Sequence, residues 1–246
     1  MKIFFFVNSS VGVQGDNRSY SYVVGISSKN DPVWTDLEFL AKLIPRICHN
    51  INRVCYIAGG LVKDQVQDVT PTFLSSHVLS TLRQVDYIAN QVRNAFLKKS
   101  LCLLVCKIDF VNTYLFKKKL LGIQVLATSG CMSAISQMPV VLIPIHFDRD
   151  TALRIPSCQR SVVLRPFCTQ DFMTGVPALP GKQLPTEVEL VFHFYYRLSN
   201  YIRRNFDLKF IFQVVNKMMT EILTVPGISR VLYDLTPKPP GTTEWE

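Results

Sequence analysis

The sequence predicts an α+β fold made of two similar subdomains, each a small antiparallel sheet backed by helices. Three observations support this prediction: short runs rich in β-branched and aromatic residues, amphipathic stretches between them, and a weak internal repeat. "RSYSYVV … INRVCYIAGG" resembles "RSVVLRPF … ISRVLYDLTPKPPG", because an Arg-Ser pair opens a strand in each copy and a later helix leads into I-x-R-V-x-Y. The alternative is chance similarity between segments that use common β-forming residues.

The first copy contains a strand at 18–27, a helix and a second strand at 51–58. Thr35 followed by Glu38 has the spacing of a capping box, so the helix is expected to begin there. Pro45 should kink this helix, because it removes one intrahelical hydrogen bond. The apolar residues on one helical face are Leu37, Leu40, Ala41, Ile44, Cys48 and Ile51.

The rest of the chain contains further elements of both kinds. Residues 61–72 read as a loop, and a second amphipathic helix is expected at 80–96. A third helix is expected at 214–225, before Pro226-Gly227. The inward residues of the two helices are Leu82, Val85, Ala89, Val92 and Phe96, and then Val215, Met218, Met219, Ile222 and Leu223. Strands are expected at 138–145, 160–167 and 228–235.

Composition argues against a disordered, membrane-spanning, secreted or disulfide-rich protein. Nearly half of the 246 residues are apolar, which predicts a folded chain, and no apolar run reaches the roughly 18 residues needed to cross a bilayer. MKIFFFV has an apolar run shorter than the roughly 7–15 residues of a secretory signal, so we expect a cytoplasmic protein of the cytosol. Seven irregularly spaced cysteines argue against both a disulfide framework and a metal site.

The last residues, DLTPKPPGTTEWE, form a stiff tail that carries charged and aromatic side chains. Pro239 and Pro240 restrict the backbone, so Lys238 is held at the end of a strand, where its ammonium suits a phosphate partner. Glu244 can accept hydrogen bonds, and Trp245 can pack the tail down or stack on a base. A solvated terminus with an incidental lysine is the alternative.

Several long motifs resemble the C-terminal dimerisation domain of glutamine-hydrolysing GMP synthases. KPPGTTEWE resembles the end of that domain, and VGVQGDNRSYSYVVGISS is similar to the V-G-V-x-G-D-x-R-S/T-Y segment that opens it. LIPRICHNINRVCYI, ISQMPVVLIPIHFDRD and DFMTGVPALPG are similar to the longer, eukaryotic form. The family aminates xanthosine monophosphate to GMP with ATP and glutamine in purine biosynthesis. The resemblance implies that this chain is the dimerisation and xanthosine monophosphate-binding portion.

The resemblance also implies a set of substrate-binding residues. Asp16, Gln137, Lys238 and Glu244 stand at the matching motif positions, and Arg18 is a reasonable fifth member. We expect Lys238 and Arg18 to face the phosphate, Gln137 to orient the ligand, and the two carboxylates to act as acceptors. These are binding roles, because no general base or nucleophile arrangement accompanies them, and no catalytic residue is assigned. For Asp16, a turn after Gly15 is the structural alternative.

The resemblance divides the chain into matched and unmatched parts. Residues 10–96 form the first subdomain, and residues 135–188 with 214–246 form the second. Residues 97–134 and 189–213 match nothing in the family, carry most of the net charge of +9, and have a composition typical of translated intron sequence. The aromatic and basic residues of 189–213 would suit single-stranded nucleic acid or a membrane surface. Because the matched parts are close to neutral, we expect neither partner.

The parent reaction needs modules that these residues do not supply. TSGCMS is not the S-G-G-x-D-S loop that binds ATP, and no cysteine has a glutaminase setting, so the fragment alone is predicted to be inactive. ATP and Mg²⁺ would serve the full enzyme through an absent module, and we expect this chain to bind no cofactor or metal. The expected partners are xanthosine monophosphate and a second copy of the chain or a full-length GMP synthase. The alternative is a truncated, non-catalytic isoform that acts as a dimerisation or interaction domain.

Overall fold

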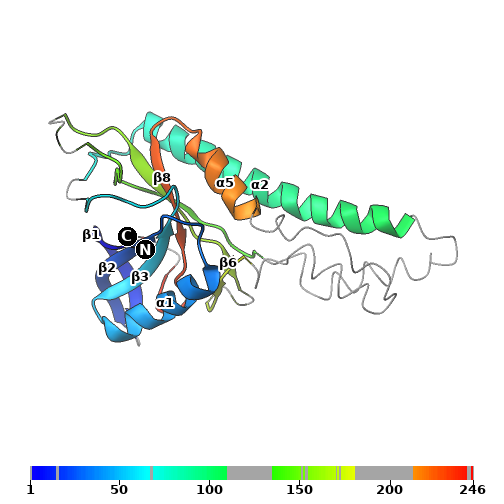
Figure 1. Cartoon of the computed structure of the whole chain (residues 1–246), viewed down its shortest axis with the longest axis horizontal. Helices are drawn as coiled ribbons and strands as arrows, with labels where there is room; N and C mark the ends of the chain where they lie inside the picture. The colour runs from blue at the N-terminus through cyan, green and yellow to red at the C-terminus, as the bar shows by residue number, and fades with distance from the viewer. Residues whose placement is uncertain are drawn as a thin grey trace.

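One six-stranded sheet forms the centre of the protein, with helices on one of its faces (Figure 1). The computed structural model describes residues 2–14, 17–66, 69–109, 135–150, 152, 155–169, 171, 173–180, 213–242 and 245. The sheet order is β1-β2-β3-β8-β5-β4, and the predicted α+β class is confirmed. Its strands are β1 (Lys2–Gln14), β2 (Asn17–Ser27), β3 (Ile51–Ile57), β4 (Val140–Ile143), β5 (Arg160–Leu164) and β8 (Ile228–Asp234). The helices are α1 (Trp34–Ile47), α2 (Ser76–Asp109) and α5 (Gln213–Leu223), and a hairpin joins β6 (Phe167–Cys168) to β7 (Val176–Pro177).

The two repeat copies share this single sheet instead of forming two separate antiparallel sheets. β3 pairs with β8 in antiparallel fashion and so joins the two halves. Within each half, β2 is parallel to β3 and β5 is parallel to β8, because a helix connects the two strands of each pair and such crossovers favour parallel pairing. The prediction of two antiparallel subdomain sheets is therefore wrong on both points. β1, which the sequence reading did not predict, is antiparallel to β2.

The internal repeat is visible as a correspondence between the halves. β1, β2 and β3 on one side of the sheet match β4, β5 and β8 on the other in order and in relative direction. The shared I-x-R-V-x-Y places Arg53 and Arg230 at equivalent positions near the starts of β3 and β8. The Arg-Ser pairs do not correspond, because Arg160 pairs with Ile228 while Tyr22, not Arg18, pairs with Ile51.

The main core lies between the sheet and its helices. Trp34, the first residue of α1, packs edge-on against Tyr56 of β3 and Tyr233 of β8, with ring centroids 5.7 and 5.4 Å apart. This packing sets the start of α1 at Trp34, so Thr35 lies within the helix and the predicted capping box is wrong. Glu38 instead forms an ion pair with Lys42. Helix residues buried in this core are Leu37, Ala41, Val85, Ala89, Val92, Val215, Met218, Met219 and Ile222.

Some predicted helix features differ in the structure. α1 ends at Ile47, so Pro45 lies in its final turn and Ile51 belongs to β3. Leu223 is partly exposed at the end of α5, and Phe96 lies outside the residues whose side chains are described. α2 begins before its predicted start and continues to Asp109, beyond the part that packs against α5 (Figure 1). None of the described helices is long and apolar enough to cross a membrane.

The opposite face of the sheet is covered by loops. Val23, Cys55, Ile57, Val163 and Leu232 point to this face, because side chains alternate along each strand. They pack against Val62 in the segment after β3, against Ile145 and Phe147 in the segment after β4, and against Trp245 near the end of the chain. Charged side chains that belong to the same face lie at its two ends, where they form the sites described below.

Candidate functional site

Two arginines and one aspartate gather at one end of the sheet, on the face opposite the helices. Arg53 is near the start of β3, Arg165 directly follows β5, and Asp234 is the last residue of β8. β3 is antiparallel to β8, and β5 is parallel to β8. The start of β3 and the ends of β5 and β8 therefore lie at the same end of the sheet. All three side chains are fully buried, and we call them the charged cluster.

Asp234 is the acceptor at the centre of the charged cluster. Its Oδ2 accepts hydrogen bonds from Arg53 Nη1 at 3.3 Å, from Arg165 Nη1, and from the Trp245 indole N–H at 3.0 Å. Its Oδ1 accepts the backbone N–H of Thr236 at 2.9 Å. Burial by itself raises the pKa of Asp234, but the two arginines and these hydrogen bonds outweigh it, so the pKa lies below its ordinary value.

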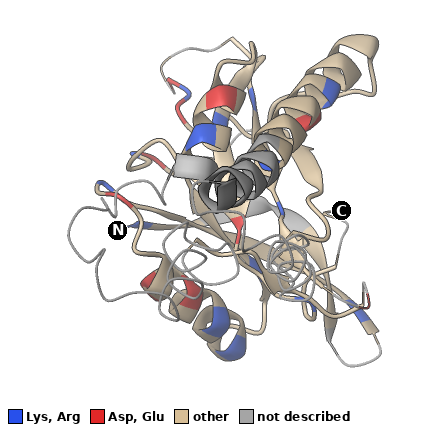
Figure 2. Ribbon diagram, turned by 90° about the vertical axis from the view of Figure 1, so that its right-hand side faces the viewer, with Lys and Arg blue, Asp and Glu red and all other residues tan. Residues whose placement is uncertain are grey.

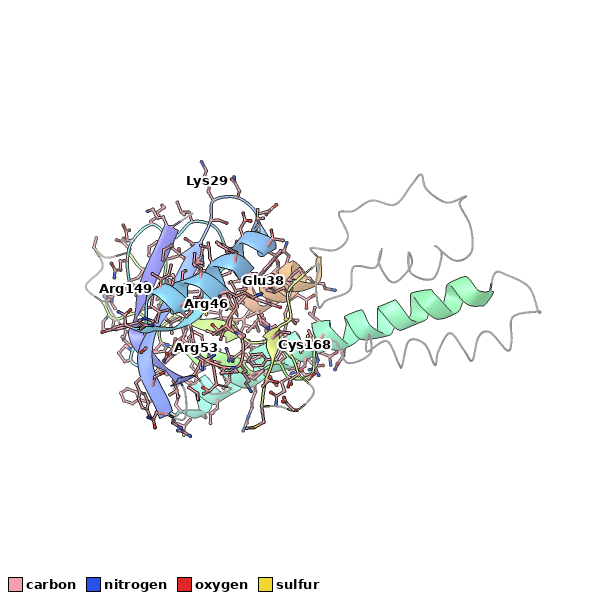
Figure 3. All side chains as sticks on the ribbon, turned by 90° about the horizontal axis from the view of Figure 1, so that it is seen from below. Lys29, Glu38, Arg46, Arg53, Arg149 and Cys168 are labelled. Carbon is pink, nitrogen blue, oxygen red and sulfur yellow. The ribbon has the colours of Figure 1, made fainter. Side chains whose placement is uncertain are left out.

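Arg53 connects the sheet to the C-terminal tail, by which we mean residues 236–242 and 245. Its Nη2 donates to the backbone carbonyls of Val11 at 2.9 Å and Thr242 at 3.2 Å, and to the Thr242 hydroxyl at 2.9 Å. Its guanidinium also lies 5.3 Å from the centroid of the Trp245 ring. Burial lowers the pKa of Arg53 to about 10, which still leaves the side chain charged at neutral pH. Figure 3 shows Arg53 within the packed body of the protein, whereas Lys29 projects outward.

The C-terminal tail is also bound to β1 and to the β6–β7 hairpin. Gly241 forms a β-bridge with Gly12, and the Val13 N–H donates to the Pro240 carbonyl at 2.7 Å. Lys238 exchanges two backbone hydrogen bonds with Gly175, at 2.8 and 3.1 Å. The two sequence motifs that carry most of the family resemblance, near residue 12 and near residue 241, are therefore adjacent in space.

Phe167 links the charged cluster to two of the predicted binding residues. The ring lies 4.2 Å from Arg165 Cζ and 4.9 Å from Lys238 Nζ, both measured to its centroid. The Phe167 backbone N–H donates to the Gln137 carbonyl at 2.7 Å. Lys238 is only 8% exposed, and Phe167 only 1%. Two buried cations therefore share one aromatic ring, next to the backbone of Gln137.

The predicted site residues lie in different surroundings. Lys238 and Gln137 are brought to Phe167, and the Gln137 Oε1 is buried without a hydrogen-bond partner among the described residues. Arg18 is exposed at the start of β2, paired with Val13 of β1. Asp16 and Glu244 lie outside the residues that the structure describes.

The sequence reading missed the charged cluster, although a signal for it was present. Arg53 stands inside the apolar run INRVCYI, Arg165 follows the apolar run SVVL, and Asp234 closes VLYD. A charge within a buried strand is costly unless it is paired, so arginines and an aspartate in such strands indicate mutual pairing. Which of them pair could not be predicted, because the strand order was unknown.

Gly241 is in contact with the charged cluster, so its replacement tests how rigid the cluster is. A Cβ built at Gly241 would lie 2.6 Å from Arg165 Nη2 and 3.1 Å from the Pro237 carbonyl oxygen. Arg165 is held by Asp234 and cannot withdraw freely, so we expect Gly241→Ala to lower the free energy of unfolding by about 1–3 kcal/mol, as overpacking does. Urea denaturation measures this change.

Gly175 provides the matched control for this substitution. It pairs with Lys238 in the same part of the fold, yet a Cβ there would have its nearest neighbours at 3.5 Å, an ordinary contact distance. Gly175→Ala should therefore change stability much less than Gly241→Ala. Equal effects of the two alanines would show that crowding at Arg165 is not what Gly241 relieves.

Charged residues elsewhere are mixed in sign. Figure 2 shows Lys and Arg interspersed with Asp and Glu on α1 and on the described part of α2. The exposed surface of α1, for example, carries Asp36, Lys42 and Arg46. In contrast, the buried charged side chains that the structure describes at this end of the sheet are Arg53, Arg165, Lys238 and Asp234.

Comparison with known proteins gives the class of this chain. Residues 202–245, which include β8 and the C-terminal tail, match a family model described as the GMP synthase C terminal domain. The resemblance to GMP synthases inferred from the motifs is thereby confirmed, and the chain is related in sequence to the C-terminal domain of those ligases.

Individual relatives are found in eukaryotes and bacteria. The chain is 38% identical over 243 residues to a probable glutamine-hydrolyzing GMP synthase of Caenorhabditis elegans. It is 34% identical over 250 residues to the glutamine-hydrolyzing GMP synthase of Dictyostelium discoideum. Each match covers 96% of this chain but only 25% and 26%, respectively, of the relative. A probable GMP synthase of Leptospira interrogans is 26% identical over 240 residues. The chain thus spans about a quarter of the length of these relatives.

Proposed function

We propose that this chain forms the portion of a GMP synthase that binds xanthosine monophosphate, and that the bound phosphate lies near Lys238. The observation that carries this proposal is the clustering of buried cations at one end of the sheet, where Arg165 and Lys238 share the Phe167 ring. Arg53, the third cation, is held together with Arg165 by the Asp234 carboxylate. Cations whose positions are fixed by the fold attract anionic ligand groups, so the phosphate of a nucleotide would bind beside them.

The individual roles follow from the chemistry of the side chains. The Lys238 ammonium is a point-charge partner for phosphate, and Arg18, exposed at the neighbouring end of β2, would approach the same group. The buried Gln137 Oε1 would accept a hydrogen bond from a ring N–H of the base. Asp16 and Glu244 would act as further acceptors. This set binds and orients a nucleotide without supplying a nucleophile.

The complete reaction would need more than these residues. ATP-dependent amination of xanthosine monophosphate, with glutamine as the nitrogen donor, requires an ATP-binding loop and a glutaminase cysteine, and neither motif occurs in the 246 residues. We propose that those parts belong to the remaining three quarters of the relatives' length. Pairing with a second copy, or with a full-length GMP synthase, would make the chain a dimerisation portion of the assembled enzyme. In that case it would act in the cytosol and bind no cofactor itself.

Replacing Lys238 with methionine tests the phosphate assignment. Calorimetric titration of the chain with xanthosine monophosphate should show an affinity about tenfold lower or worse for Lys238→Met, because a charge-assisted hydrogen bond to phosphate is lost. Xanthosine, which has no phosphate, should bind equally to both proteins. Lys217→Met is the matched control, since Lys217 is an exposed lysine on α5. Unchanged affinity of Lys238→Met for the nucleotide would refute the assignment.

A further inference from the structure

The two ends of the sheet contain equivalent arginines with different partners. Arg53 and Arg230 occupy the same position of the repeated I-x-R-V-x-Y, at opposite ends of the β3–β8 pair. Arg230 forms a bidentate ion pair with Asp148, at 2.6 and 2.5 Å. It also donates to the carbonyls of Ala58 at 3.1 Å and Gly60 at 2.8 Å. Its partners therefore all come from segments that directly follow β3 and β4.

Arg53 is bonded to segments far apart in the sequence. Its acceptors include Asp234 at the end of β8, Val11 in β1, and Thr242 in the C-terminal tail. Asp234 in turn accepts the Trp245 indole N–H, so the tail is held at two points by one ion pair. Along the chain, Lys238 and Gly241 lie between β8 and these two points, and they form β-bridges with Gly175 and Gly12, respectively.

We propose that Arg53, through Thr242 and Asp234, is a positioning residue that holds the tail closed and so places Lys238 for ligand binding. Arg230 and Asp148 are the structural counterpart at the other end and take no part in binding. This inference rests on the proposed function of Lys238. The physical link is a population effect: if the tail is docked only part of the time, the apparent affinity is the intrinsic affinity multiplied by the docked fraction.

Substitutions at Thr242 test this role without removing a buried charge. Thr242→Val keeps the shape and the backbone carbonyl but removes the hydroxyl that accepts from Arg53, whereas Thr242→Ser keeps the hydroxyl. Asp148→Asn is the matched control, because it weakens the equivalent ion pair of Arg230 at the other end of the β3–β8 pair. Two signals are measured on the full chain: the affinity for xanthosine monophosphate, and the fluorine resonance of 5-fluorotryptophan at Trp245, assigned with Trp245→Phe.

The expected result separates positioning from general destabilisation. Thr242→Val should weaken nucleotide binding by about tenfold and shift the Trp245 resonance towards that of exposed tryptophan, because a hydrogen bond to a charged group is lost. Thr242→Ser should restore both signals. Asp148→Asn should lower thermal stability with both signals unchanged.

Two results would overturn the proposal: wild-type signals in Thr242→Val, or an equal change of both signals in Asp148→Asn. If the unmodified chain binds no xanthosine monophosphate, the proposed function fails. The Trp245 resonance then decides by itself whether Arg53 holds the tail.

Discussion

Replacing Asp234 with alanine is expected to lower the free energy of unfolding by about 3–5 kcal/mol, the cost of breaking a buried ion pair. The substitution leaves the guanidinium groups of Arg53 and Arg165 buried without their shared carboxylate. It also removes the acceptor of the Trp245 indole N–H, so the tail loses one of its attachments. Urea denaturation at pH 7, compared with the unmodified chain, measures the difference.

Asp148→Ala provides the control for this prediction. Asp148 pairs with the equivalent Arg230, but its side chain is 48% exposed, so water can solvate the arginine that remains. Its loss should cost much less than the loss of Asp234. Similar costs for both alanines would contradict the assignment of Asp234 as the buried centre of the cluster.

The charge of Asp234 also predicts a pH dependence. The pKa of Asp234 in the folded chain lies below its ordinary value, so the unfolded chain takes up the proton first as the pH falls. Its contribution to stability is complete above the unfolded pKa of about 4 and is lost as the pH falls through the folded pKa. As the pH is lowered from 5, the free energy of unfolding of Asp234→Ala should therefore fall less than that of the unmodified chain. Parallel curves would contradict this linkage.

Phe167→Ala is expected to have a second large effect, lowering the free energy of unfolding by about 3–5 kcal/mol through loss of a buried aromatic side chain. It should also weaken the binding of xanthosine monophosphate. The reason is that the ring contacts both Arg165 and Lys238, and its removal takes away one of the contacts that position the Lys238 ammonium. Denaturation and calorimetric titration of the same protein measure the two effects.

Phe167→Leu separates packing from the contact between cation and ring. Leucine retains much of the buried apolar volume, so stability should recover substantially, but it has no π-face for the two cations. We expect the leucine variant to bind the nucleotide more weakly than the unmodified chain. Full recovery of binding with leucine would show that Phe167 acts only as a core residue.

The sequence predicted the elements of this fold better than their arrangement. The strands that became β2, β3, β5 and β8 were recognisable from local β-forming composition, and α1 and α5 from helical periodicity. The single sheet was not predicted, because it depends on pairing between β3 and β8, which are far apart in the sequence. The start of α1 was misplaced because packing of Trp34 overrode the capping signal of Thr35.

The candidate site was only partly accessible to sequence reasoning. Lys238 and Gln137 were predicted from the family resemblance, and both lie beside Phe167 in the structure. Arg53 and Asp234 were overlooked because each reads locally as an isolated charge in a strand. Their significance depends on β3 and β8 running in opposite directions, which brings the start of one strand to the end of the other.

The place of β8 in the sheet has a consequence for synthesis and truncation. β8 is the last described strand along the chain, yet it lies between β3 and β5. Until it emerges from the ribosome, the inner edges of β3 and β5 have no partner strand, and such open edges are templates for aggregation. A nascent or proteolysed chain that ends before Ile228 would therefore consist of two unjoined half-sheets with open edges, the kind of species that aggregates readily.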